Sequence, residues 1–144
     1  MNFIFPDYPL KKEIRDGQEY VWDIIRKKWI SLQKEEYIRQ LLIHFLINKK
    51  GISASLISVE REIQYNNLRK RFDVVVFDSN AKPLILCEVK ASDVTISQDT
   101  LQQIARYNKV IQAPHLLITN GIVLLFFSLT EEGRYMLQKN WLTD

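Results

Sequence analysis

The sequence is poor in cysteine, glycine and proline, and it has no long hydrophobic run. Cys87 is the only cysteine in 144 residues, which excludes an intrachain disulfide and a zinc site built from several thiolates. Four glycines and four prolines exclude collagen-like and low-complexity chains. The longest apolar run, residues 122–127, is too short to span a membrane, and the first residues do not resemble a signal peptide. We therefore expect a soluble cytoplasmic protein with no membrane partner.

A strong excess of charge of one sign is also absent. Twenty Lys and Arg residues stand against seventeen Asp and Glu residues, so the net charge is +3 and permits a nucleic-acid partner without requiring one. The hydrophobic content of 47% is typical of globular proteins, and the length fits one domain. We expect a single domain over residues 1–144. It would comprise a basic, aromatic extension (1–33), a core (34–129) and a tail with a short helix (130–144).

Hydrophobic periodicity predicts an α/β core. Apolar residues at helical spacing predict helices over residues 34–48 and 98–111. Alternating or β-branched segments predict strands over residues 56–65, 72–77, 84–90, 115–119 and 122–129. Turn residues predict a hairpin between the second and third strands, and the second helix suits a right-handed crossover to the fourth. The expected architecture is a mixed sheet, with an antiparallel hairpin and a parallel crossover, flanked by helices on both faces.

The predicted hairpin brings three charged residues to one end. Pairing residues whose numbers sum to 161 places Asp73 opposite Glu88, and Lys90 then projects from the same face as Glu88. Opposed carboxylates repel each other, but a divalent cation between them reverses this, and hard oxygen ligands suit Mg²⁺ or Mn²⁺. The ammonium of Lys90 can polarise a metal-bound water or offset phosphate charge. The alternative is that all three are ordinary residues of a solvated sheet edge.

These residues carry a resemblance to a known group of enzymes. Asp73, followed after a hairpin by Glu88-Val89-Lys90, resembles the core signature of the PD-(D/E)xK nuclease superfamily. Residues 103–107 resemble the Gln-x-x-x-Tyr motif of its RecB-like branch. Over about residues 20–125 the chain is similar to the nuclease domain at the N-terminus of type I restriction enzyme R proteins. Phe72 replaces the proline that names the superfamily, and the sequence has no Walker A motif for a motor.

The resemblance implies a restriction-endonuclease-like fold and a role for each motif residue. Asp73, Glu88 and the carbonyl of Val89 would bind Mg²⁺, with Mn²⁺ as an alternative, and Lys90 would orient or activate the attacking water.

The family also places a metal-linked glutamate on the first core helix, where it acts through a water. Glu35 and Glu36 compete for this role. The position of Glu35 on the apolar stripe and its spacing from Arg39 favour Glu35.

Further residues are assigned to the DNA. Gln103 and Tyr107 lie four apart, so they share a helix face, and the resemblance implies that they arrange the metal site and the DNA backbone. Basic residues expected to contact DNA are Arg26, Lys27, Lys28, Arg71 and Arg106. The basic, aromatic stretch from Lys11 to Trp29 either contacts phosphates and stacks on bases or forms a solvated face with core anchors.

Three functional interpretations follow. The first is a magnesium-dependent deoxyribonuclease, with an endonuclease favoured over an exonuclease. The second is a non-catalytic DNA-binding or assembly module that retains the nuclease fold. The third is an unrelated α/β interaction domain, in which Asp73 and Glu88 would point into separate environments. Besides DNA, partners left open are a separate motor or restriction-system subunit and a second copy of the chain.

Overall fold

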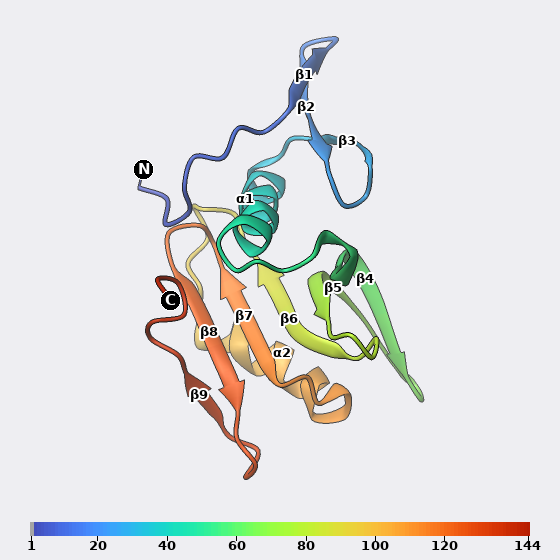
Figure 1. Cartoon of the computed structure of the whole chain (residues 1–144), viewed down its shortest axis with the longest axis vertical. Helices are drawn as coiled ribbons and strands as arrows, with labels where there is room; N and C mark the ends of the chain where they lie inside the picture. The colour runs from blue at the N-terminus through green and yellow to red at the C-terminus, as the bar shows by residue number, and fades with distance from the viewer. Residues whose placement is uncertain (1) are drawn as a thin grey trace.

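The computed structural model describes residues 2–144 and contains two separate β-sheets and two α-helices (Figure 1). The elements in chain order are β1 (Lys12–Arg15), β2 (Gln18–Asp23), β3 (Lys28–Ser31), α1 (Lys34–Asn48), the 3₁₀ turn η1 (Ala54–Leu56), β4 (Ile57–Tyr65), β5 (Leu68–Phe77), β6 (Pro83–Val89), α2 (Gln98–Ile111), β7 (His115–Thr119), β8 (Leu124–Leu129) and β9 (Tyr135–Leu137). In this part of the chain, no helix is both long and apolar enough to cross a membrane.

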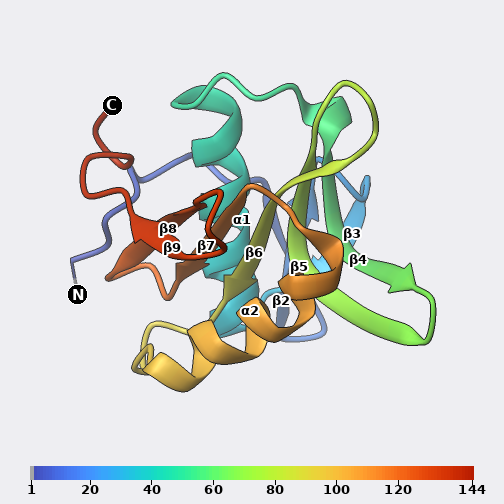
Figure 2. The same cartoon turned by 90° about the horizontal axis from the view of Figure 1, so that it is seen from below.

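The larger sheet has six strands in the order β4-β5-β6-β7-β8-β9. All of its neighbours are antiparallel except β6 and β7, and α2 lies in the connection between these two parallel strands. Helix α1 packs on one face with a cluster that contains Val74 and Cys87, and α2 packs on the other with Val75 and Leu86. Figure 2 shows the two helices on either side of β6 and β7. The expected mixed sheet with helices on both faces is confirmed.

The β5–β6 hairpin follows the predicted register for three residue pairs. These pairs are Val74 with Cys87, Val75 with Leu86, and Val76 with Ile85. A bulge then places Phe77 opposite Pro83, so the prediction that Phe77 faces Leu84 is wrong. The reason is the five-residue loop 78–82, in which the side chain of Asp78 accepts backbone hydrogen bonds from Asn80 and Lys82.

The C-terminal tail contradicts the helix predicted after residue 130. The chain instead makes a turn, in which Gly133 has a φ of +81° and the N–H of Thr130 donates to the carbonyl of Arg134 at 2.7 Å. Strand β9 then pairs antiparallel with β8. The Thr130 hydroxyl accepts from the Arg134 N–H within this turn, so the capping signal was real but served a hairpin.

The N-terminal extension is a folded element that the sequence analysis did not predict. It forms the antiparallel sheet β1-β2-β3, and Val21 and Asp23 on β2 are fully buried against the rest of the molecule. The organisation of residues 1–144 as a single domain stays a prediction.

Helix α1 connects this extension to the core. Its C-terminal half buries apolar side chains such as Leu42 and Phe45, each of which stabilises the fold by about 2 kcal/mol. Its N-terminal half buries Glu36, Arg39 and Gln40, which need polar partners there.

Candidate active site

Asp73 lies on β5 at the end of the β5–β6 ladder. Its Oδ2 accepts a hydrogen bond from the backbone N–H of Val89 at 2.7 Å. Its Oδ1 accepts one from Nη2 of Arg39 at 3.1 Å. Two donors from different elements therefore fix the orientation of this carboxylate.

An irregularity in the sheet sets the direction of Asp73. The β4–β5 ladder passes from the pair Arg61–Phe72 to the pair Val59–Val74, and Glu60 between them has a φ of +51°. Phe72 packs in the cluster beneath α2, whereas Val74 packs in the cluster beneath α1. Residues two apart on a regular strand share a face, so β5 rotates at Asp73. Irregularities of this kind re-aim side chains beside active sites.

Glu88, on the neighbouring strand, has a different environment. Its side chain is 15% exposed, and its buried Oε1 has no hydrogen-bond partner among residues 2–144. The nearest cation is Nζ of Lys70, at 3.7 Å from Oε1. Burial, together with the negative charge of Asp73, raises the pKa of Glu88 to about 8. This carboxylate therefore pays a desolvation cost that the fold leaves largely uncompensated.

Lys90 and Glu35 complete the group of charges. The backbone N–H of Lys90 donates to the carbonyl of Thr119 at 2.9 Å, which holds it beside β7. Burial and the charge of Asp73 raise the pKa of Glu35, while the positive charge of Lys90 acts on it in the opposite direction. Lys90 acts in the same way on the pKa of Glu88. The four predicted catalytic residues on α1, β5 and the end of β6 thus lie within electrostatic reach of one another.

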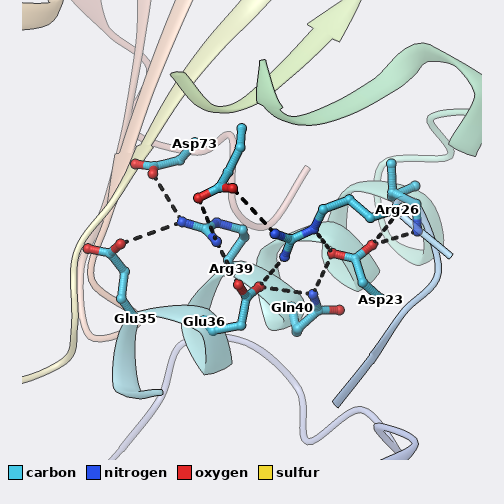
Figure 3. A network of polar contacts seen from close by, with 9 residues as sticks. Asp23, Arg26, Glu35, Glu36, Arg39, Gln40 and Asp73 are labelled. Atoms are coloured by element: carbon cyan, nitrogen blue, oxygen red, sulfur yellow. Dashed lines mark hydrogen bonds and ion pairs between the residues drawn. The ribbon is translucent and has the colours of Figure 1, made fainter. Parts of the chain in front are cut away.

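The two neighbouring glutamates of α1 have separate roles. Glu36 is buried and accepts hydrogen bonds from Arg26 at 2.8 Å and from Arg39 at 2.7 Å (Figure 3). The side chain of Glu35 is 45% exposed and lies 3.5 Å from Arg39, on the side of Asp73. Glu36 is therefore held by two arginines, whereas Glu35 is more exposed and makes one longer contact with Arg39.

Arg39 belongs to a buried polar network that extends to the small N-terminal sheet (Figure 3). Asp23 accepts from Nε of Arg26 at 2.7 Å and from Nε2 of Gln40 at 2.9 Å. Although burial raises the pKa of Asp23, these hydrogen bonds hold it below its ordinary value. Through Glu36, the network continues from Asp23 to the arginine that orients Asp73. Sequence reasoning did not find it, although Glu36, Arg39 and Gln40 share a face of the helix.

The predicted DNA-binding residues lie in different settings. Arg26 has a 14% exposed side chain that is paired with Asp23 and Glu36, a geometry that favours a structural role. Lys27 and Lys28 are exposed at the turn between β2 and β3. Two more exposed arginines lie on β5 and α2, namely Arg71 and Arg106. DNA contact by these five residues stays a prediction.

Lys70 lies between Tyr107 of the Gln-x-x-x-Tyr helix α2 and Glu88, and the sequence analysis did not assign Lys70 to the site. Nζ of Lys70 lies 5.7 Å from the ring centroid of Tyr107 and 3.7 Å from Oε1 of Glu88. Gln103 is exposed on α2, and the structure gives it no hydrogen bond to either carboxylate. Lys70 had no signal in the sequence because its position depends on how β5 runs past α2.

The donor set limits which ligands the site can hold. Over residues 2–144, no three side chains of Asp, Glu, His or Cys are grouped closely enough to hold a metal ion. A cation here would rely on Asp73, on Glu88 with its unpartnered Oε1, and on backbone or water oxygens. Hard oxygen donors of this kind fit Mg²⁺ or Mn²⁺ and do not fit zinc.

The chain therefore has an α/β fold with a mixed six-stranded sheet and a helix on each face. Residues 34–140 match the family described as type I restriction enzyme R protein N terminus (HSDR_N), and the chain belongs to this family.

One solved structure that resembles the chain is a fragment described as an HsdR subunit of a type I restriction enzyme from Vibrio vulnificus YJ016. The two share 21% sequence identity with a TM-score of 0.42, and the match covers 57% of this chain and 18% of the other. No curated protein sequence matches the chain.

Proposed function

We propose that the chain is a metal-dependent nuclease domain that hydrolyses DNA phosphodiester bonds. The observation that carries this proposal is the buried Oε1 of Glu88, which has no hydrogen-bond partner among the described residues and lies near the charges of Asp73 and Lys90. Such a carboxylate is costly for a fold, and a bound cation would offset the cost. Family membership supports the same function.

In this proposal, Asp73, Glu88 and the Val89 carbonyl hold Mg²⁺ or Mn²⁺, and Glu35 acts through a water. The cation, when bound, supplies activation of water and stabilisation of charge on the scissile phosphate. Asp73 is already oriented by Arg39 and by the backbone, so it loses little conformational freedom when it binds.

Lys90 is assigned to orient the attacking water or to offset negative charge on the phosphate. Its ammonium donates hydrogen bonds to the attacking water or to a phosphate oxygen, and its fixed backbone limits where the side chain can reach. The resemblance implies that the products carry a 5′-phosphate and a 3′-hydroxyl. A motor or another restriction-system subunit is a proposed partner, because the chain belongs to a family of type I restriction enzyme R proteins.

A cleavage assay with matched variants tests the proposal. Circular plasmid and single-stranded DNA are incubated with Mg²⁺ or Mn²⁺, and cleavage of the closed circle would identify an endonuclease. Asp73→Ala and Lys90→Ala should each lower the rate by about 100-fold or more. Lys82→Ala, which changes an exposed lysine of the same hairpin, should have no effect. Equal activity in all four proteins would refute the proposal.

The second candidate function is a DNA-binding or assembly module without catalysis. It is favoured by the ion pair between Arg39 and Asp73 and by the lack of a third ligating side chain in the described chain. Calorimetry with Mn²⁺ distinguishes the two functions. An intact fold that binds no metal would support the module, whereas binding that Glu88→Gln abolishes would support the enzyme.

A further inference from the structure

The three-stranded N-terminal sheet has one face that the core does not use. On β2, Val21 and Asp23 point inward and are fully buried, so Tyr20 and Trp22 lie on the opposite face. Trp29 on β3 pairs with Trp22 and lies beside it. We call the three rings of Tyr20, Trp22 and Trp29 the aromatic face.

Cations lie over the rings of this face. The two indole rings are 5.5 Å apart at an angle of 70°, and Nζ of Lys11 lies 5.5 and 5.6 Å from their centroids. The guanidinium of Arg15 lies 5.6 Å from the Tyr20 ring and 5.5 Å from the Trp29 ring. The surface thus alternates aromatic rings with positive charges.

The aromatic face contributes little to the fold. None of its three rings belongs to either hydrophobic cluster of the described chain, although both clusters include many half-buried side chains. Figure 1 shows the small sheet at one end of the molecule, apart from the six-stranded sheet. Three half-buried aromatic rings that belong to neither hydrophobic cluster, gathered on one sheet face with cations over them, indicate a binding surface.

We propose that the aromatic face binds a single-stranded segment of DNA, with unpaired bases stacked on the rings and phosphates held by Lys11 and Arg15. Duplex bases are stacked inside the helix and are out of reach of such rings, whereas every unpaired base offers a flat face. Glu13, the carboxylate on this face, is paired with Arg15 at 3.0 Å, so it does not oppose a phosphate with a free charge. The choice of DNA over RNA rests on the proposed nuclease function.

The opposite, inward face of the small sheet, which carries Val21, contacts the helix of the candidate active site. Nζ of Lys12, on the adjacent strand, lies 5.7 Å from the ring of Tyr37 on α1. Tyr37 is two residues from Glu35, in the same first turns of the helix. Asp23 anchors the sheet to the network that orients Asp73. The small sheet, which carries the aromatic face on its outer side, is therefore anchored to the helix that carries Glu35.

Tryptophan fluorescence provides a direct test in EDTA, where cleavage cannot occur. The full chain carries three tryptophans, and Trp141 lies elsewhere, stacked on Phe126 at 4.1 Å. In a Trp141→Phe background, an oligothymidylate of about 15 nucleotides should quench the emission of the two remaining tryptophans. Trp29→Ala should weaken binding by about tenfold, and Trp29→Tyr, which keeps a ring, should restore most of it. Arg15→Gln alters an exposed residue without removing a ring, and it should reduce the salt dependence of binding.

Other outcomes of these measurements would contradict strand binding or assign the aromatic face to another partner. Equal affinity for an abasic strand, or tighter binding of duplex DNA, would overturn stacking on single strands. Concentration-dependent self-association that protects the tryptophans from quenching would assign the face to a second copy of the chain instead. Strand binding without plasmid cleavage would leave this inference intact and remove the proposed nuclease. If the wild type cleaves plasmid but binds no single strand, and Trp29→Ala cleaves equally well, this inference fails and the proposed nuclease stands.

Discussion

The two carboxylates of the candidate site lie on adjacent strands, but their surroundings differ. Asp73 has a hydrogen-bond donor on each oxygen, one from Arg39 and one from the backbone of Val89. The buried Oε1 of Glu88 lies 3.7 Å from Nζ of Lys70 and has no hydrogen-bond partner among the described residues. Both oxygens of Asp73 accept a hydrogen bond without any ligand, whereas the buried oxygen of Glu88 accepts none. We infer that the first carboxylate holds the geometry of the site and the second provides the driving force for binding a cation.

Breaking the Arg39 network should have the largest effect on stability. Arg39→Met removes one of the two arginines that pair with the buried Glu36 and the arginine that pairs with the partly buried Asp73, and we expect the free energy of unfolding to fall by about 3–5 kcal/mol. Chemical denaturation measures this change. Arg69→Met is the control, because Arg69 and Glu62 form an exposed ion pair whose loss should cost less than about 1 kcal/mol. Similar losses in both variants would mean that the network is not what holds Asp73.

Glu88 should make the metal-free protein less stable as the pH rises. Its pKa is about 8 when folded and 4.5 ordinarily, so between these values the unfolded chain releases a proton that the folded chain retains. The free energy of unfolding should therefore fall from pH 4.5 to pH 8, by about 5 kcal/mol, and then level off. Denaturation in EDTA at several pH values measures this slope. Glu88→Gln should remove it and Glu62→Gln, at an exposed site, should keep it; a slope that persists in Glu88→Gln would contradict the prediction.

Magnesium should stabilise the folded protein by offsetting the cost of burying the Glu88 carboxylate. At ten times its dissociation constant, a ligand that binds only the folded state stabilises it by about 1.4 kcal/mol. We expect this gain in the wild type, measured as a rise in the unfolding midpoint, and we expect it to be absent in Glu88→Gln. Sodium chloride at matched ionic strength is the control. An equal gain in the variant would indicate that magnesium binds elsewhere.

Removing Lys70 should have the smallest effect on stability. Its ammonium lowers the pKa of Glu88, so Lys70→Met should move that pKa further upward. The cost in stability should stay below about 1 kcal/mol, because the lysine side chain is partly exposed. A carboxyl titration followed by NMR measures the shift, and Lys82→Met is the control at a remote position of the same hairpin. An unchanged pKa of Glu88 would show that the charge of Lys70 does not act on this carboxylate.

Local patterns predicted most of the fold. The bounds of α1, α2 and β7 agree with the sequence analysis, because hydrophobic periodicity and end signals are local properties of the chain. The hairpin register was correct until the loop at Asp78 shifted it. The C-terminal prediction failed because pairing with β8 outweighed a local capping signal, which no pattern within residues 130–141 could reveal.

The motif residues of the candidate site were proposed from the sequence, but the residues that contact them were not. Asp73, Glu88 and Lys90 were recognisable from spacing along one hairpin. Arg39 and Lys70 were not, because each reaches the carboxylates across the fold, and Asp73 faces Arg39 only after β5 rotates. Long-range contacts of this kind have no signature in a single sequence.

The contact of Asp23 with α1 shows that the segment that matches the family differs from the segment that is joined by buried polar contacts. The family match covers residues 34–140, but Gln40 and Arg26 depend on a carboxylate at residue 23. A chain cut at the family boundary would retain every motif residue and still lose Asp23, Arg26 and the buried Val21. It would leave Glu36 with a single arginine in an apolar setting. The segment that matches the family is therefore shorter than the segment joined by these buried polar contacts, and expression trials should begin upstream of β1.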